Sequence, residues 1–350
     1  MVHPDRFPLK RVQQSGSSRF LNHCRSTSTA VRPDDVPLLL EQKLKSFGLA
    51  LLCLLCSCLS GRADDFRILS WNVESNRPGQ PPVSDPATIA TEIRQMAATE
   101  ATRFSILVLS EVEPVTVDRF QSAAAEGLGT SVDFVTSASG GFGDTDSLML
   151  LVDSTKFEIR DALEIHRHGG LRGNFNNPAD ASEPGALRAR SPLAVKLAFK
   201  SNGATFWVIA NHLARGEADL RTEQARMLRQ WAMDSREPII AAGDFNFDFD
   251  FKTQQGNPGF QAMLEGDTWA WLKPDPLIDS NWSDDRQIKD RRVDRYPDSI
   301  LDFVFVANDA KKWNGVSNVV VRPGDFPDSD KTSDHRPLLT SFRPTTQPAQ

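Results

Sequence analysis

Ile239-Ile240-Ala241-Ala242-Gly243-Asp244-Phe245-Asn246-Phe247-Asp248 begins as an uncharged apolar run and turns polar after a glycine. Such a run is typical of a strand buried on both faces. We expect the strand to end near Gly243 and to present Asp244 and Asn246 on one side, since side chains two residues apart in an extended chain point the same way. A carboxylate beside an amide can bind a hard cation, orient a water molecule or contact a phosphate oxygen. An ordinary Asx turn is the alternative.

Other apolar runs also lead into polar residues. The runs at residues 66–72, 104–109 and 205–212 predict strands that lead to Asn72, Glu111 and His212. Asp302 lies inside a further run, and Asp334 and His335 stand just before the last one. Each residue alone has an ordinary explanation, such as a solvated loop carboxylate for Glu111 or a satisfied core histidine for His212. Asp302 is the exception, because a buried carboxylate is rarely left unpaired.

Residues 64–345 are expected to form one domain, because this part contains neither a linker-like break nor a repeat. Strand signals alternate with helical spacing, which indicates α/β layers. The helices are predicted at residues 85–97, 115–128, 217–234 and 260–264. The long polar loop at 169–187 is expected to be functional. The alternating Phe247, Phe249 and Phe251 favour packing over an aromatic wall for substrate.

The N-terminal region has the pattern of an exported protein. Residues 1–42 are rich in Ser, Arg and Pro and are predicted to be disordered, or an extension upstream of the true start. Residues 43–63 combine a charged flank, an apolar run and small residues near Ala63, which predicts a signal peptide and a secreted or periplasmic protein. The run is too short for a stable membrane span. A buried core helix and a lipoprotein, for which Leu55-Cys56-Ser57-Cys58 is the candidate motif, are the less favoured alternatives.

Cysteine positions and charge exclude several classes of protein. All four cysteines lie at or before Cys58, so the rest of the chain can have neither a thiolate zinc site nor a catalytic thiol. Residues 1–63 carry nine Lys and Arg against four Asp and Glu, and the whole chain has a net charge of −6, which leaves −11 on the remainder. Such an acidic domain does not attract nucleic acid at long range, although a cation could bridge it to a phosphate ester.

The ordered series of motifs resembles the endonuclease/exonuclease/phosphatase family, also called deoxyribonuclease-I-like, over residues 66–342. The motifs are Ser70-Trp71-Asn72, Ser110-Glu111, Asn211-His212-Leu213, Gly243-Asp244-Phe245-Asn246, Leu301-Asp302-Phe303 and Ser333-Asp334-His335-Arg336-Pro337. The resemblance implies an α/β (α+β) four-layer sandwich, in which two mixed β-sheets pack face to face with helices on the outside. It also implies a site at one rim of the sandwich.

The resemblance further implies a metal site. Glu111, helped by Asn72, would bind a catalytic Mg²⁺, with Mn²⁺ or Ca²⁺ as alternatives, and Asp334 would lie near the same ion. Oxygen ligands favour these hard cations over zinc on chemical grounds as well.

The remaining roles concern the water, the phosphate and the protons. Asp244 and Asn246 would position the attacking water and the phosphate. His335 would act as general base or transition-state donor, oriented by Asp302, and His212 would be a candidate acid for the leaving oxygen. Arg190 resembles the family's phosphate-contacting arginine, for which a surface arginine before a strand is the alternative.

These residues together predict a secreted, metal-dependent enzyme that hydrolyses phosphodiester bonds by in-line attack of a metal-oriented water, most simply a nuclease. The expected partner is a phosphate-ester substrate, with nucleic acid as one candidate, and the protein is expected to be a monomer. The alternatives are a phospholipid phosphodiesterase or phosphomonoesterase with the same chemistry, and a non-catalytic binding module on the same fold.

Overall fold

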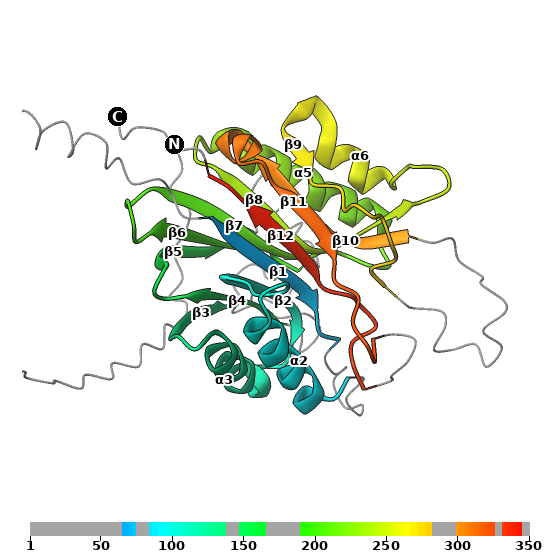
Figure 1. Ribbon diagram of the computed structural model, residues 1–350. Coiled ribbons are helices and arrows are strands. Elements are labelled where there is room, and N and C mark those ends of the chain that lie inside the picture. The colour runs from blue at the N-terminus through cyan, green and yellow to red at the C-terminus, as the bar shows by residue number, and fades with distance from the viewer. Residues whose placement is uncertain are drawn as a thin grey trace, which may run out of the picture.

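The computed structural model describes residues 65–74, 84–137, 147–165, 190–281, 299–325 and 331–344 (Figure 1). The predictions for residues 1–42, for the signal peptide at 43–63 and for the loop at 169–187 lie outside these residues. None of the helices in the described part is long and apolar enough to cross a membrane.

Two six-stranded sheets form the centre of the domain. The first sheet has the order β11-β12-β1-β2-β4-β3, with β1 Phe66–Asn72, β2 Ile106–Val112, β3 Val132–Thr136, β4 Ser147–Asp153, β11 Val316–Val319 and β12 Leu338–Phe342. The second has the order β5-β6-β7-β8-β10-β9, with β5 Phe157–Glu164, β6 Leu193–Phe199, β7 Thr205–His212, β8 Ile239–Asp250, β9 Trp269–Trp271 and β10 Ser299–Ala307.

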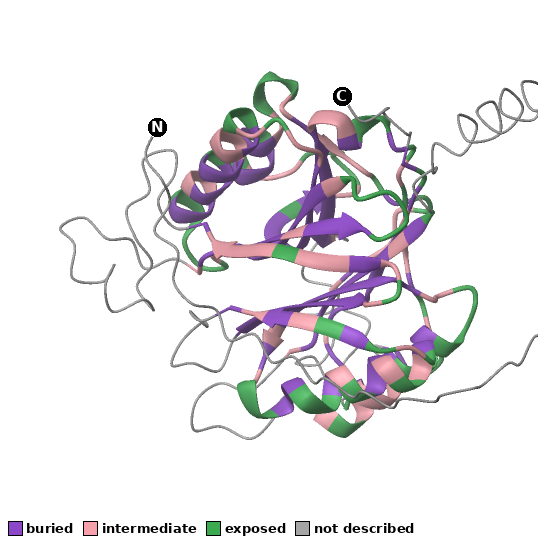
Figure 2. Ribbon diagram, turned by 90° about the vertical axis from the view of Figure 1, so that its left-hand side faces the viewer, coloured by how far each residue is buried: buried purple, intermediate pink, exposed green. Residues whose placement is uncertain are grey.

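Helices cover the outer faces of both sheets, so the predicted four-layer sandwich is confirmed (Figure 2). Helices α2 (Pro86–Ala98) and α3 (Val117–Leu128) pack on the first sheet, and α5 (Ala218–Asp234) and α6 (Pro258–Leu264) pack on the second. Short 3₁₀ turns complete the structure at Pro114–Thr116, Glu265–Asp267 and Asn308–Lys312. The first of these turns explains why α3 begins at Val117 and not at residue 115, where the sequence predicts it.

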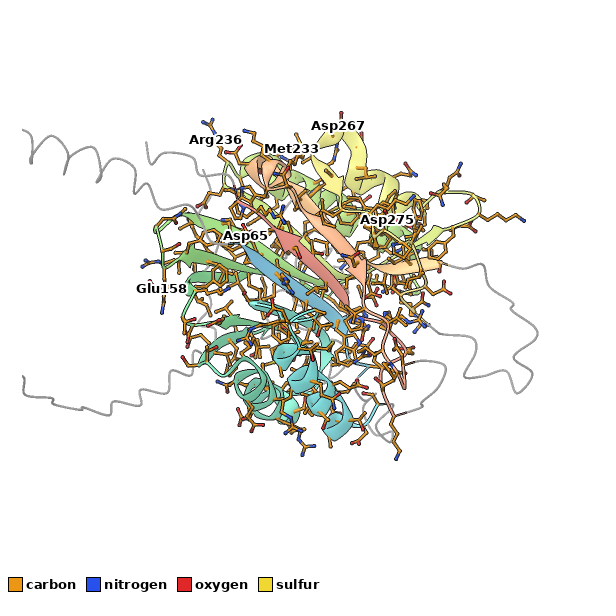
Figure 3. The ribbon with its side chains drawn as sticks, in the orientation of Figure 1. Asp65, Glu158, Met233, Arg236, Asp267 and Asp275 are labelled. Atoms are coloured by element: carbon orange, nitrogen blue, oxygen red, sulfur yellow. The ribbon has the colours of Figure 1, made fainter. Side chains whose placement is uncertain are left out.

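The core between the sheets is strongly aromatic at the end where β1 begins. The ring of Phe66 stacks on Phe342 with centroids 5.1 Å apart, and Phe199 stacks on Phe206 at 4.9 Å. Burial of each such side chain contributes about 1.5–3 kcal/mol. Asp65, which is labelled in Figure 3, marks this end of β1. The opposite end of the strand carries the polar Asn72, so one end of the sandwich is built for packing and the other can hold a site.

Two parallel strand pairs bring the polar residues to that rim. β1 pairs in parallel with β2, and α2 connects them; β7 pairs in parallel with β8, and α5 connects them. Parallel strands joined by a crossover helix end at the same edge of their sheet. Asn72, Glu111 and His212 lie at or near the carboxyl ends of β1, β2 and β7, and Asp244 on β8 pairs with His212, so all four residues reach one edge of the sandwich.

Local irregularities of the strands place two of the site residues. The β2–β4 pairing shifts between Leu109 and Val112, and Glu111 within this bulge has a φ of +56°. The β8–β10 pairing shifts between Ile300 and Asp302, and Asn246 on the opposite strand has a φ of +54°. Bulges redirect side chains, and residues in left-handed conformations often occur at functional sites.

The structure corrects the prediction for β8 in two respects. The strand does not end near Gly243 but continues to Asp250, because Phe249 and Asp250 pair again with Ile300 and Ser299. The left-handed backbone at Asn246 also interrupts the alternation that placed Asp244 and Asn246 on one side. Phe247 and Phe249 are buried in the aromatic core, so the predicted packing role of the phenylalanine stripe is confirmed.

The apolar runs at residues 148–152, 193–199 and 316–321 also predict strands, which correspond to β4, β6 and β11, whereas β3, β5 and β9 are missing from the sequence prediction. Each of the missing strands lies at the edge of its sheet. An edge strand has a neighbour on one side alone and often exposes part of its surface, so its apolar signal is weak. In β5 no residue after Phe157 is fully buried, and β9 has three residues.

Gly243 allows β7 and β8 to approach closely just before the site. Its φ is +135°, and a Cβ at this position would lie 2.2 Å from the carbonyl oxygen of Asn211. Any side chain at position 243 is therefore disfavoured both by the backbone conformation and by the closeness of β7.

We expect Gly243→Ala to lower the free energy of unfolding by more than about 1 kcal/mol, because the methyl group must displace the backbone of β7. The measurement is thermal and denaturant unfolding followed by circular dichroism. Gly203→Ala is the matched control, since Gly203 has a φ of +76° with open space around its Cβ position. Equal losses in the two variants would show that the close approach to Asn211 is not a constraint.

Candidate active site

The carboxylate of Asp244 lies at the centre of the site. Its Oδ2 atom is 3.1 Å from Asn72 Nδ2, 3.7 Å from His212 Nε2 and 3.9 Å from His335 Nε2. Its Oδ1 atom accepts a hydrogen bond of 2.9 Å from the backbone N–H of Asn246. One buried carboxylate thus connects residues from both sheets and from the loop before β12, as the sequence predicts.

Asn72 connects Asp244 to Glu111. Its Nδ2 atom donates to Asp244 Oδ2 and to Glu111 Oε1, each at 3.1 Å, and its Oδ1 atom accepts from the backbone N–H of Glu74 at 3.0 Å. The amide therefore presents its N–H groups, and not its oxygen, to the two carboxylates. In this arrangement Asn72 holds the two carboxylates beside each other, and the metal-binding role that the resemblance implies for it stays a prediction.

In the part of the chain that the structure describes, carboxylates outnumber cationic groups around Asp244. Carboxylate oxygens are the donors that a hard divalent cation prefers, so the site is chemically suited to bind one. Glu111 and Asp244 share one amide donor, and Asp334 Oδ1 lies 3.7 Å from His335 Nε2. Among the described residues, no three His, Cys, Asp or Glu side chains already form a metal cage. Mg²⁺ does not require one, because it is usually bound through one or two carboxylates and retains several waters. Glu111 and Asp334 remain the residues that would bind it.

His335 and Asp302 form a buried acid–base pair, as predicted. His335 Nδ1 lies 2.7 Å from Asp302 Oδ2, which leaves Nε2 facing Asp244 and Asp334. The same Oδ2 atom accepts a hydrogen bond of 2.8 Å from the hydroxyl of Ser280, which in turn accepts from the backbone N–H of Leu301. The carboxylate thus fixes the imidazole with Nε2 directed into the site, the orientation that a general base needs.

Burial and charge act in opposite directions on this pair. Burial alone would lower the pKa of His335, but the carboxylates of Asp302, Asp334 and Asp244 outweigh it and raise the pKa well above its ordinary value. Burial raises the pKa of Asp302, although His335 opposes the shift. In the absence of a metal ion we therefore expect the pair to share one proton, held mainly by the imidazole.

The segment around His335 is attached to the rest of the rim by several contacts. Trp71 Nε1 donates to the carbonyl oxygen of His335 at 2.8 Å, and Glu74 Oε2 accepts from the backbone N–H of Asp334 at 2.9 Å. Arg336 Nε donates to Asp325 Oδ2 at 3.1 Å. These contacts hold the backbone on both sides of the imidazole, so its position depends on the first sheet as well as on Asp302.

His212 and Arg190 lie together beside Asp244. His212 Nε2 is 3.5 Å from Glu111 Oε1, and Arg190 Nη1 donates to the same nitrogen. The guanidinium of Arg190 thus reaches the site, as the sequence predicts, and is not simply a surface group ahead of β6. A cation beside an imidazole and two carboxylates is suited to contact a phosphoryl oxygen.

Asn246 is bonded to two neighbouring segments, and its predicted contact with water and phosphate stays a prediction. Its Nδ2 atom donates to the carbonyl oxygen of Leu213 at 3.1 Å, and its own carbonyl oxygen accepts from Asn257 Nδ2 at 3.0 Å. One N–H group of the side-chain amide therefore holds the chain after β7. The backbone N–H bond to Asp244 also shows that the Asx turn considered as an alternative is present.

Sequence reasoning missed Glu74 and Ser280. Glu74 lies two residues after Asn72, so its spacing could have indicated it as a rim residue. Ser280 has no such signal, because its hydroxyl reaches Asp302 from a segment 22 residues away. Its role depends wholly on the tertiary structure.

The fold and the rim together define an α/β sandwich with a site of carboxylates and imidazoles. The model of the Endonuclease/Exonuclease/phosphatase family matches residues 69–335, and the chain belongs to this family. Members of the family are hydrolases that act on phosphoesters. No curated protein sequence matches the chain.

Several solved structures share the fold at low sequence identity. An endonuclease/exonuclease/phosphatase from Bacteroides vulgatus is 14% identical, with a TM-score of 0.56 over 81% of this chain and 100% of that one. A mannosyl-6-phosphatase from Bacteroides thetaiotaomicron is 16% identical, with a TM-score of 0.55 over 79% of this chain and 99% of the other. A humanized D. rerio TDP2 is 14% identical, with a TM-score of 0.53 over 79% and 98%.

Asp302→Asn should lower the pKa of His335 in the metal-free protein, because the amide no longer balances the imidazolium charge. NMR titration of the imidazole in the presence of EDTA measures the decrease. Asp309→Asn is the control, since Asp309 forms an ion pair with Lys312. An unchanged His335 titration in Asp302→Asn would contradict the assigned pair.

Proposed function

We propose that this chain is a secreted, divalent-metal-dependent phosphodiesterase, most simply a nuclease, that hydrolyses its substrate by in-line attack of water. The observation that carries the proposal is the convergence of Asp244 with Glu111, His212 and His335 at one rim. These groups come from four separate segments of the chain, and each supplies a function that phosphoester hydrolysis needs.

The protein groups divide the proton transfers between the two histidines. His335, held through Nδ1 by Asp302, presents Nε2 to accept the proton of the attacking water. His212 also lies near Asp244 and is the candidate to protonate the leaving oxygen. Asp244 Oδ2 lies 3.7 Å and 3.9 Å from the two imidazoles, where it can orient the water by a hydrogen bond. Arg190 contributes its guanidinium to the phosphoryl group.

The metal ion is part of this proposal. Glu111 and Asp334 would hold Mg²⁺, or alternatively Mn²⁺ or Ca²⁺, with Asn72 fixing the carboxylate of Glu111. When bound, such an ion supplies charge neutralisation at the phosphoryl oxygens and lowers the pKa of bound water. The net charge of −11 on residues 64–350 makes this neutralisation important for any anionic substrate.

A phosphomonoesterase is the second candidate. The site offers one arginine beside His212, and the same groups can serve a phosphate monoester or a phosphodiester. One protein with a similar fold is a mannosyl-6-phosphatase, which supports keeping this candidate in a substrate panel. The panel consists of bis-p-nitrophenyl phosphate, p-nitrophenyl phosphate, plasmid DNA and sphingomyelin, each assayed with Mg²⁺ and with EDTA.

We expect Glu111→Ala and His335→Ala each to lower the turnover of the best substrate by about 10²- to 10⁴-fold, because one removes a cation ligand and the other the general base. EDTA should abolish wild-type turnover, and Mg²⁺ should restore it. Glu126→Ala is the control, since Glu126 forms an ion pair with Arg94 on the helical surface. Full activity in either site variant, or metal-independent turnover, would contradict the assignments.

Arg190→Ala should weaken substrate binding more than it slows catalysis, because the guanidinium contacts phosphate in the bound state. A lost hydrogen bond to a charged group corresponds to about a tenfold to hundredfold rise in KM. Steady-state kinetics measures the change, with Arg160→Ala on β5 as the control for lost positive charge. A wild-type KM in Arg190→Ala would show that Arg190 does not contribute to substrate binding.

The proposed secretion of the protein leads to a separate prediction about its N-terminus. If residues 43–63 are a signal peptide, the exported protein should begin at or near residue 64, where the described domain starts. Mass spectrometry of protein recovered outside the cytoplasm identifies the N-terminus. A mature protein that begins before Lys43 would refute the signal peptide.

A further inference from the structure

Two polar residues lie on the buried face of α5. Arg221 is 7% exposed and Gln224 is 0% exposed, among the apolar Leu220, Met227 and Leu228. Burial of an amide or a guanidinium is unfavourable unless its polar atoms find partners. α5 begins just after β7 ends, so its first turns lie at the site rim. Met233 and Arg236, which are labelled in Figure 3, mark its other end.

The amide of Gln224 bridges two segments that carry site residues. Its Nε2 atom donates to the carbonyl oxygen of Arg190 at 2.9 Å, and its Oε1 atom accepts from the backbone N–H of Ala214 at 2.9 Å. Arg190 precedes β6, and Ala214 follows His212 by two residues. A single side chain thus fixes the backbone on both sides of the contact between Arg190 and His212.

Arg221 strengthens the same attachment. Its Nη1 atom donates to the carbonyl oxygens of Ala214 at 2.9 Å and of Arg215 at 2.6 Å. Ala214 is therefore held at its N–H group by Gln224 and at its carbonyl group by Arg221. The preceding residue, Leu213, donates its N–H to the carbonyl oxygen of Asp244 at 3.0 Å. The chain after His212 is thus attached to both α5 and β8.

We infer that Gln224 is a positioning residue that sets the placement of Arg190 against His212 and thereby the binding of the phosphoryl group. The inference rests on the proposed function. Gln224 is buried and bonded at both ends of its amide to backbone, so it acts through Arg190 and His212 and not by contact with substrate. Small displacements of binding groups are costly, since a misplacement of about 1 Å can reduce activity by about 100-fold.

The test is Gln224→Met in the full chain, which keeps the length of the side chain and removes both hydrogen bonds. The expected result is a rise of about 10- to 100-fold in KM and a similar weakening of inhibition by inorganic phosphate, with a smaller change in kcat. Gln230→Met on the same helix is the matched control, since Gln230 donates to Asp234 at the surface. That variant should behave like the wild type.

A double-mutant cycle separates positioning from a general structural effect. If Gln224 acts through Arg190, then Gln224→Met should have little further effect on phosphate inhibition in an Arg190→Ala background, so the two effects are not additive. A general loss of structure would instead lower kcat and weaken inhibition equally in both backgrounds. Full additivity would overturn the inference.

Each result decides between the inference and the proposed function. Wild-type turnover with unchanged KM in Gln224→Met overturns the inference alone. A wild-type protein that hydrolyses no phosphoester overturns the proposed function and the inference together. If Gln224→Met does not fold, Gln224→Glu takes its place, because it retains the acceptor for Ala214 and loses the donor to Arg190. It too must raise KM, and a wild-type KM in that variant overturns the inference.

Discussion

Asp244 carries a carboxylate into the interior of the rim, where 2% of the residue is exposed, and the site is arranged around the partners of this charge. A buried carboxylate is stable only when donors and positive charge compensate its lost hydration. Asn72 from the first sheet and the backbone of Asn246 from the second supply the donors. The packing of the two sheets and the geometry of the site therefore depend on each other, and a shift between the sheets would separate Asn72 from Asp244.

The backbone departs from regular strand geometry where the site residues lie. Glu111 and Asn246 have positive φ, and Gly243 allows an approach of β8 to β7 that no other residue permits without a shift. Such conformations are unfavourable on their own and persist because the surrounding sheets hold them. The aromatic packing around Phe66, at the other end of the sandwich, belongs to the rigid core on which these irregular segments are built.

Negative charge at the rim influences both the metal binding and the proton transfer that we propose. Among the described residues, Asp244, Glu111, Asp302 and Asp334 lie close to two histidines and one arginine, so carboxylates are in excess there. The excess raises the pKa of His335 in the metal-free protein and favours the binding of a divalent cation. A bound cation would reduce the same excess and release the imidazole to act as a base. In the enzyme that we propose, metal binding and general-base function would thus be coupled through shared carboxylates.

The sequence alone determined where the central strands lie along the chain and which polar residues accompany them, because a strand buried on both faces has a continuous apolar run with a sharp change to polar residues. That was enough to indicate Asn72, Glu111, His212 and Asp244 as one set. It did not determine the edge strands β3, β5 and β9, whose apolar signal is weak.

The tertiary structure alone decided the contacts of Ser280 with Asp302 and of Gln224 with Arg190 and Ala214. It also decided that Asn72 presents N–H groups to its neighbours and that Asn246 bonds to Leu213. Hydrogen bonds between distant segments depend on where the backbone is placed in space, and no local pattern of residues records that placement.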